Sequence, residues 1–158
     1  MLLKDQSILS KTDISNVALN ELKHSRIKTI HMFARRSPVQ SAFTSKEFKE
    51  LIQLPDLNVI IDTNQHDLST QDMDELNHSS KAKSNMALIS NIQSNPKASR
   101  QLFIHYYSQP SCILGTDIVS GIQLERTTLS GLAGQRYAKG TGTIYTVECD
   151  YVFLSIGY

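Results

Sequence analysis

The sequence predicts an α/β protein that contains an antiparallel β-meander. In the first 98 residues, apolar residues at helical spacing alternate with short β-type runs, as in chains that build a parallel sheet. From Arg100 onward the apolar spacing becomes that of β-strands. All seven glycines lie between Gly115 and Gly157, so the turns that glycine favours are concentrated in this second part. The length of 158 residues suits one domain.

The N-terminal part begins with the expected return half of an α/β unit. Residues 1–9 are interpreted as the end of an element, because apolar side chains occur there with no capping residue before them. The next helix begins at Thr12 or Asp13 and ends near His24, since its apolar residues recur every four positions. Arg26–Phe33 follows as a strand. A helix followed closely by a strand is typical of a parallel sheet.

A second helix begins at Thr44, because Thr44 and Glu47 match the capping-box pattern. It ends at Leu54-Pro55, since proline cannot continue a helix. The remaining elements expected in this part are a short strand at Val59–Ile61, a solvated acidic loop with one or two helical turns at Asp62–Glu75, and a helix from Lys81 to about Ser94.

Residues 99–150 are predicted to form the meander. Tyr151–Ile156 is apolar without alternation, which is typical of a parallel strand covered on both faces. The expected strands of the meander are Leu102–Tyr107, a run from Ile118 to Leu124, and Thr143–Cys149, with a glycine-rich hairpin loop between Gly131 and Gly142.

Composition and charge exclude several classes of protein. Hydrophobic residues make up 40% and charged residues 20%, so the chain is neither disordered nor collagen-like. A formal net charge of +1 speaks against a nucleic-acid partner. No apolar run approaches the about 20 residues of a membrane-spanning helix, which leaves at most peripheral membrane association. Cys112 and Cys149 form no CxxC pair and the five histidines are scattered, so no metal site is expected.

Arg35 and Arg36 form the strongest candidate site, because they directly follow a predicted strand. In doubly wound folds ligands bind at the carboxyl ends of the strands, and an arginine at this position accommodates the 2′-phosphate of NADP. Guanidinium groups suit phosphate because their planar donors can bind it bidentately. The alternative is a solvated arginine pair beside a turn. Glu47 has two possible roles as well. It caps its helix with Thr44, and it could in addition orient an arginine or a ribose hydroxyl.

The densest pattern of matching residues lies between Thr12 and Pro55. It combines the arginine pair with Ala42-Phe43-Thr44, Lys46-Glu47 and Ile52-Gln53-Leu54-Pro55. Over this stretch the chain resembles the NADP-binding domain of the adrenodoxin reductase family, the mitochondrial-type ferredoxin-NADP reductases. The closing Ser155–Tyr158 resembles the last strand of that domain.

The resemblance implies an incomplete Rossmann-like, three-layer NADP-binding domain over residues 1–158, with its first strand and glycine-rich turn missing. Residues 1–98 would form the α/β part and residues 99–150 the meander. Residues 151–158 would be the last strand, leading to an FAD domain absent from this chain. We therefore expect a fragment that is inactive alone and in which a targeting segment is absent or lost.

The resemblance also implies a function. The family takes hydride from NADPH onto FAD and passes single electrons to an iron–sulfur ferredoxin in the mitochondrial matrix. Arg35 and Arg36 would bind the 2′-phosphate and Glu47 would contact the nucleotide, and no residue is expected to be a catalytic acid or base. The sequence departs from the family at Ala34 and Ser37, where glycine is usual.

A basic surface for the acidic ferredoxin is a further implication of the resemblance, with a solvated helix face as the alternative. A different function for the whole chain, a non-catalytic truncated binding or regulatory module, also remains open. The lysines that match the basic surface are Lys49, Lys81 and Lys83.

Overall fold

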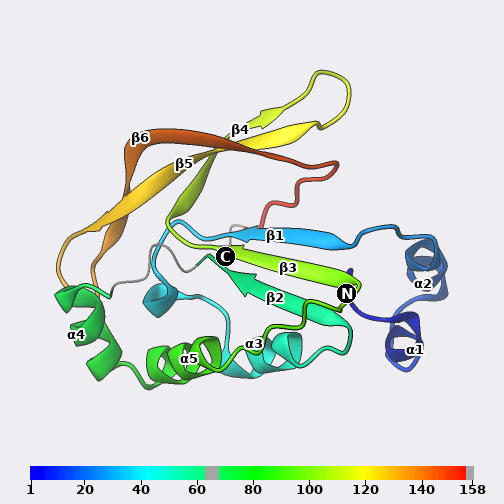
Figure 1. Ribbon diagram of the computed structural model, residues 1–158, viewed down its shortest axis with the longest axis horizontal. Helices are drawn as coiled ribbons and strands as arrows, with labels where there is room; N and C mark the ends of the chain where they lie inside the picture. Colours follow the sequence, from blue (N-terminus) through cyan, green and yellow to red (C-terminus); the bar gives the residue numbers. More distant parts are fainter. Residues whose placement is uncertain (63–67, 156–158) are drawn as a thin grey trace.

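A computed structural model describes residues 1–62 and 68–155. Two three-stranded sheets form its framework (Figure 1). The first sheet is parallel with strand order β1-β3-β2, and the second is antiparallel with strand order β4-β5-β6. The strands are β1 (Thr29–Phe33), β2 (Leu57–Ile61), β3 (Arg100–His105), β4 (Ser108–Leu114), β5 (Gly121–Ser130) and β6 (Tyr137–Glu148).

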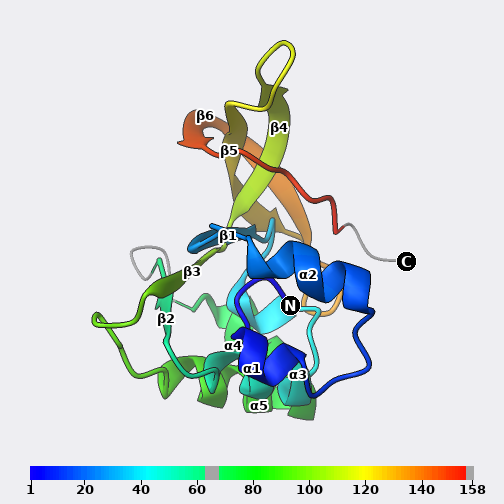
Figure 2. The ribbon, with the colours of Figure 1, turned by 90° about the vertical axis from the view of Figure 1, so that its right-hand side faces the viewer.

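Helices α3 and α5 lie on one side of the parallel sheet, and the antiparallel sheet lies on the other (Figures 1 and 2). The core forms where the helices meet the sheet, and Phe48 of α3 packs there with Val59, Leu102 and Ile104 of the strands. Burial of these apolar side chains is the main stabilising term for this half of the molecule. The helical segments are α1 (Gln6–Leu9), α2 (Asn16–Lys23), the 3₁₀ helix η1 (Pro38–Gln40), α3 (Ser45–Ile52), α4 (Thr70–His78) and α5 (Ser80–Ser90).

Most of the expected helices form with shifted ends. The helix expected from Thr12 or Asp13 is α2, which Ser15 caps by accepting a hydrogen bond from the Ala18 N–H at 3.2 Å. The capping box that begins α3 is confirmed. The acidic segment is more helical than expected, because Ser69 caps a nine-residue helix, α4.

The strand expected at Leu102–Tyr107 forms as β3, but its assignment to the meander is wrong. It is the central strand of the parallel sheet and pairs with both β1 and β2. A division after residue 98 therefore separates β3 from its own sheet. The chain then turns through Tyr107, whose φ of 52° lies in the left-handed region, and enters β4. The meander consists of β4, β5 and β6.

The strand expected at Tyr151–Ile156 is not found in the described part of that segment. Residues Tyr151–Ser155 carry no strand, and Tyr151, Phe153 and Leu154 are exposed to 68%, 71% and 71%. A β-strand requires a hydrogen-bonded neighbour, and no described strand pairs with this segment. The rest of the expected strand lies outside the described residues.

No described helix is both long and apolar enough to cross a membrane.

Candidate functional site

Arg35 and Arg36 lie directly after β1, at the carboxyl edge of the parallel sheet. Thr127 of β5 and Tyr107, which precedes β4, fix their backbone. The Thr127 hydroxyl donates to the Arg35 carbonyl at 2.7 Å, and the Tyr107 N–H donates to the Arg36 carbonyl at 3.3 Å. Both arginine side chains stay exposed. The loop is thus held by its main chain, while the two guanidinium groups are left available.

Arg36 lines a cavity of about 490 Å³. Three segments form its walls: η1, the junction between α4 and α5, and the turn that joins β5 to β6. The cavity therefore joins parts of the chain that lie far apart in the sequence. Its charged or titratable lining residues are Arg36, Asp74, Glu75, His78 and Lys81.

Both acids of this cavity are engaged with other groups. A carboxylate oxygen of Asp74 lies 3.3 Å from Nδ1 of His78. Oε1 of Glu75 accepts a hydrogen bond from the Gly134 N–H at 3.0 Å. The arginine and the lysine of the cavity form no ion pair with any residue that the structure describes. The cavity therefore brings an arginine and a lysine that lack direct ion pairs to described residues together with two carboxylates, and these four formal charges balance.

The walls of the cavity are tied together by the carboxylate of Asp72. Its Oδ1 lies 2.6 Å from Nη1 of Arg136, and the two side chains are exposed to only 1% and 6%. Ser37 donates to Oδ1 at 2.9 Å, and the Ser69 N–H donates to Oδ2 at 3.0 Å. Burial would raise the pKa of Asp72, but these hydrogen bonds and the Arg136 charge outweigh it and lower the pKa below its usual value.

Ser37 explains one of the two departures from the family pattern. Its side chain is buried, and Oγ accepts from the Val39 N–H at 3.2 Å while it donates to Asp72. A glycine has no hydroxyl and could make neither contact. The serine therefore anchors the loop that follows Arg36.

Glu47 lies in the first turn of α3, where it completes the capping box. Its Oε2 accepts from the Thr44 N–H at 3.0 Å and from the Thr44 hydroxyl at 2.7 Å. These bonds, followed by the charge of Lys81, lower the pKa of Glu47. The capping role is confirmed. Arg36 and Lys81 lie together in the cavity, whereas Arg35 and Glu47 are outside its lining.

The three lysines of the expected basic surface differ in their surroundings. Nζ of Lys81 donates to the Ala42 carbonyl at 2.8 Å, within the cavity described above. Nζ of Lys83 donates to the Asn77 carbonyl at 2.9 Å, at the end of α4. Lys49 is exposed on α3.

The sequence-based interpretation missed Asp72, Ser37 and Arg136. A capping pattern at Ser69 and Asp72 was visible in the sequence, and it would have located the start of α4. The ion pair joins residues 64 positions apart, so no local pattern could indicate it.

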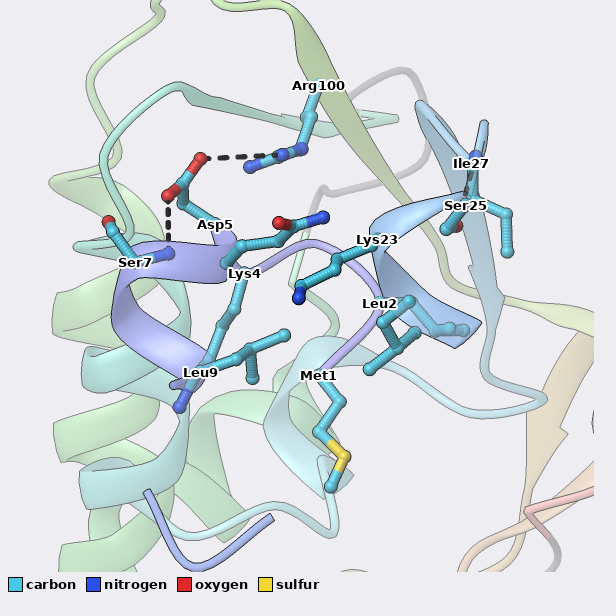
Figure 3. Close-up of a pocket in the computed structure, with 12 residues that line it drawn as sticks. Met1, Leu2, Lys4, Asp5, Ser7, Leu9, Lys23, Ser25, Ile27 and Arg100 are labelled. Atoms are coloured by element: carbon cyan, nitrogen blue, oxygen red, sulfur yellow. Dashed lines mark hydrogen bonds and ion pairs between the residues drawn. The ribbon is translucent and has the colours of Figure 1, made fainter. Parts of the chain in front are cut away.

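A second cavity, of about 470 Å³, lies at the amino ends of the parallel strands (Figure 3). In its lining, Asp5 accepts a hydrogen bond from the Ser7 N–H at 2.8 Å and lies 3.9 Å from Arg100. None of the site residues expected from the sequence lines it.

Two histidines meet on the parallel sheet. Nδ1 of His31 lies 2.9 Å from Nε2 of His105, and the His31 ring stacks on Phe103 with centroids 4.8 Å apart. Burial lowers the pKa of both histidines, and their proximity lowers that of His105 further. Among the described residues, no three His, Cys, Asp or Glu side chains form a group that could hold a metal ion.

Comparison with known proteins gives consistent relatives over the whole chain. A mitochondrial NADPH:adrenodoxin oxidoreductase from Arabidopsis thaliana is 32% identical over 169 residues, covering 100% of this chain and 35% of the relative. The NADPH-ferredoxin reductase FprA of Mycobacterium tuberculosis is 32% identical over 162 residues, with coverage of 100% and 35%. No protein-family model matches the chain.

The fold agrees with these relatives. The structure of Mycobacterium tuberculosis FprA in complex with NADPH matches with a TM-score of 0.90 and 31% identity, covering 99% of this chain and 35% of that chain. The α/β class expected from the sequence is therefore confirmed. The chain spans 35% of the length of the relatives described here.

Proposed function

Because the chain belongs to the adrenodoxin reductase family over the stretch that it covers, we propose that it supplies the NADP-binding region of an NADPH-dependent ferredoxin reductase. The observation that carries this proposal is Arg36, which lines a cavity at the carboxyl edge of a parallel sheet. This edge is where doubly wound folds bind their ligands. In such a reductase NADPH would supply the hydride and FAD, held outside this chain, would supply the conversion to single electrons for an iron–sulfur ferredoxin, while the residues of this chain would hold the nucleotide.

The residues present fit a phosphate group. Arg36 offers planar N–H donors, and no described carboxylate forms an ion pair with it. We assign the 2′-phosphate of NADP to Arg36 and the adjacent Arg35. Asp72 holds Ser37 and thereby fixes the loop in which both arginines lie, so less ordering is required when the phosphate binds.

Glu47 is proposed to contact the ribose of the nucleotide. Its carboxylate is held in place by the Thr44 cap, and hydrogen bonds to Thr44 keep its pKa low, so it would present a charged acceptor. A ribose hydroxyl is a donor that such an acceptor can bind. Capping and ligand binding are compatible, because a carboxylate accepts several hydrogen bonds.

The ferredoxin partner is proposed to bind a basic surface that includes Lys49 and Lys83, which are exposed. Lys81 is a less suitable member of that surface, because it lines the cavity. A location in the mitochondrial matrix is proposed from the mitochondrial relatives, while the mycobacterial FprA is a bacterial example of the same family.

Replacing Arg35 and Arg36 by glutamine tests the assignment. The affinities of the purified chain for adenosine 2′,5′-bisphosphate and adenosine 5′-monophosphate would be compared by titration calorimetry. A hydrogen bond to a charged group contributes roughly 1.5–3 kcal/mol, so the preference for the 2′-phosphate should fall at least about tenfold. Arg26→Gln, an exposed arginine ahead of β1, is the matched control. An unchanged preference in the double variant would refute the assignment.

A further inference from the structure

We propose that Lys81 is a specificity-determining residue for the 2′-phosphate, so that the site takes its positive charge from two separate parts of the chain. This inference rests on the proposed function. It adds a residue of α5 to the 2′-phosphate site, which the sequence analysis had assigned only to the loop after β1. The resemblance had placed Lys81 on a surface for a protein partner instead. The structure gives it different surroundings.

Lys81 and Arg36 approach one cavity from different walls. Lys81 belongs to the first turn of α5, and Arg36 belongs to the loop after β1. The Lys81 ammonium donates one hydrogen bond to the Ala42 carbonyl at 2.8 Å. An ammonium carries three donors, so two remain for an anion. The carbonyl contact restrains the long side chain and reduces the entropy that it would lose on binding.

The described carboxylates near Lys81 make their hydrogen bonds and close contacts with other groups. A carboxylate oxygen of Asp74 lies 3.3 Å from Nδ1 of His78, and Glu75 accepts a hydrogen bond from the Gly134 N–H at 3.0 Å. Outside the lining, the charges of Glu47 and Lys81 act on each other without a direct ion pair, and Glu47 Oε2 accepts its hydrogen bonds from Thr44. Lys81 forms no ion pair with any residue in the described ranges 1–62 and 68–155. A phosphate bound between Lys81 and Arg36 would form the direct ion pairs that neither side chain makes with a described residue.

Lys83 provides a close comparison within the same helix. Like Lys81, it is exposed and its ammonium donates to a backbone carbonyl, that of Asn77 at 2.9 Å. Unlike Lys81, it does not line the cavity. Any effect that arises only from the loss of one positive charge on α5 should therefore appear equally in variants of either lysine.

The experiment compares Lys81→Gln, Lys83→Gln and Arg36→Gln in the purified chain. Glutamine keeps a donor for the backbone carbonyl but removes the charge. Adenosine 2′,5′-bisphosphate and adenosine 5′-monophosphate are titrated against each variant, and thermal unfolding is followed by circular dichroism. We expect K81Q to bind the 2′,5′-bisphosphate about five- to tenfold more weakly, with little change for the monophosphate. K83Q should bind both as the parent does.

The outcomes separate this inference from the proposed function. If R36Q loses the 2′-phosphate preference while K81Q retains it, Lys81 has no such role and the proposed function stands. If neither R36Q nor K81Q changes the preference, the proposed function itself fails. If K81Q and K83Q weaken binding equally, the effect is one of general charge and the inference is wrong. Lys81→Arg, which keeps the charge, should restore most of the preference if K81Q is poorly folded.

Discussion

Replacing Asp72 by asparagine should destabilise this protein strongly. The Asp72 carboxylate is 1% exposed and lies 2.6 Å from the guanidinium of Arg136, which is itself only 6% exposed. Asparagine has nearly the same shape but no charge. The substitution therefore leaves a buried guanidinium uncompensated and turns amide hydrogens toward some of the donors that the carboxylate had accepted.

The magnitude follows from the burial of the pair. Breaking a buried ion pair by removing one partner costs about 3–5 kcal/mol. The Asp72 carboxylate also accepts hydrogen bonds from Ser37 at 2.9 Å and from Ser69 at 3.0 Å, so the upper half of that range is expected. Domains have total stabilities of about 5–15 kcal/mol. At about 2–4 °C per kcal/mol, the midpoint of thermal unfolding should fall by roughly 8–20 °C.

Urea unfolding followed by circular dichroism measures this loss directly. Asp74→Asn is the matched control, because Asp74 lies two positions further along α4 and its side chain is 58% exposed. Its substitution should change the free energy of unfolding by less than about 0.5 kcal/mol. If the free energy of unfolding of Asp72→Asn stays within about 1 kcal/mol of that of the parent protein, the ion pair does not hold together the segments that carry Ser37, Asp72 and Arg136.

Two further perturbations have defined outcomes. The pKa values of His31 and His105 are lowered from 6.5 in the folded protein, so protons bind first to the unfolded chain as the pH falls. The stabilisation that follows from these lowered pKa values is complete above pH 6.5 and is lost as the pH falls towards the folded pKa values. In urea unfolding, His105→Gln should reduce the dependence of the free energy of unfolding on pH, whereas His24→Gln should not. Equal pH dependence in the parent protein and in His105→Gln would contradict this expectation. Gly115 has φ +119°, and an added Cβ would lie 1.9 Å from the Ile118 carbonyl oxygen, whereas Gly134 has φ +77° and open space around it. Gly115→Ala should therefore lower the free energy of unfolding by about 3 kcal/mol and Gly134→Ala by about 1 kcal/mol, so the midpoint of thermal unfolding should fall further for Gly115→Ala. The reverse order would show that the loop around Gly115 relaxes freely.

Local features were predictable from the sequence because the residues that produce them are neighbours. Thr44 and Glu47 lie one helical turn apart, so their capping box could be recognised and is observed. The position of Arg35 and Arg36 after a strand follows from the apolar run before them. The prediction of which strands pair was wrong for β3. Its composition suits a strand of either sheet, and only its contacts with β1 and β2 make it part of the parallel sheet.

The sequence by itself determined the α/β class, the start of α3 and the position of the arginine pair, because these depend on periodicity and on residues a few positions apart. The tertiary structure alone decided which distant groups surround Arg36. Lys81 reaches its cavity from α5, and Asp72 meets Arg136 across 64 positions. Such contacts depend on how the elements pack, and a local sequence pattern does not indicate that packing.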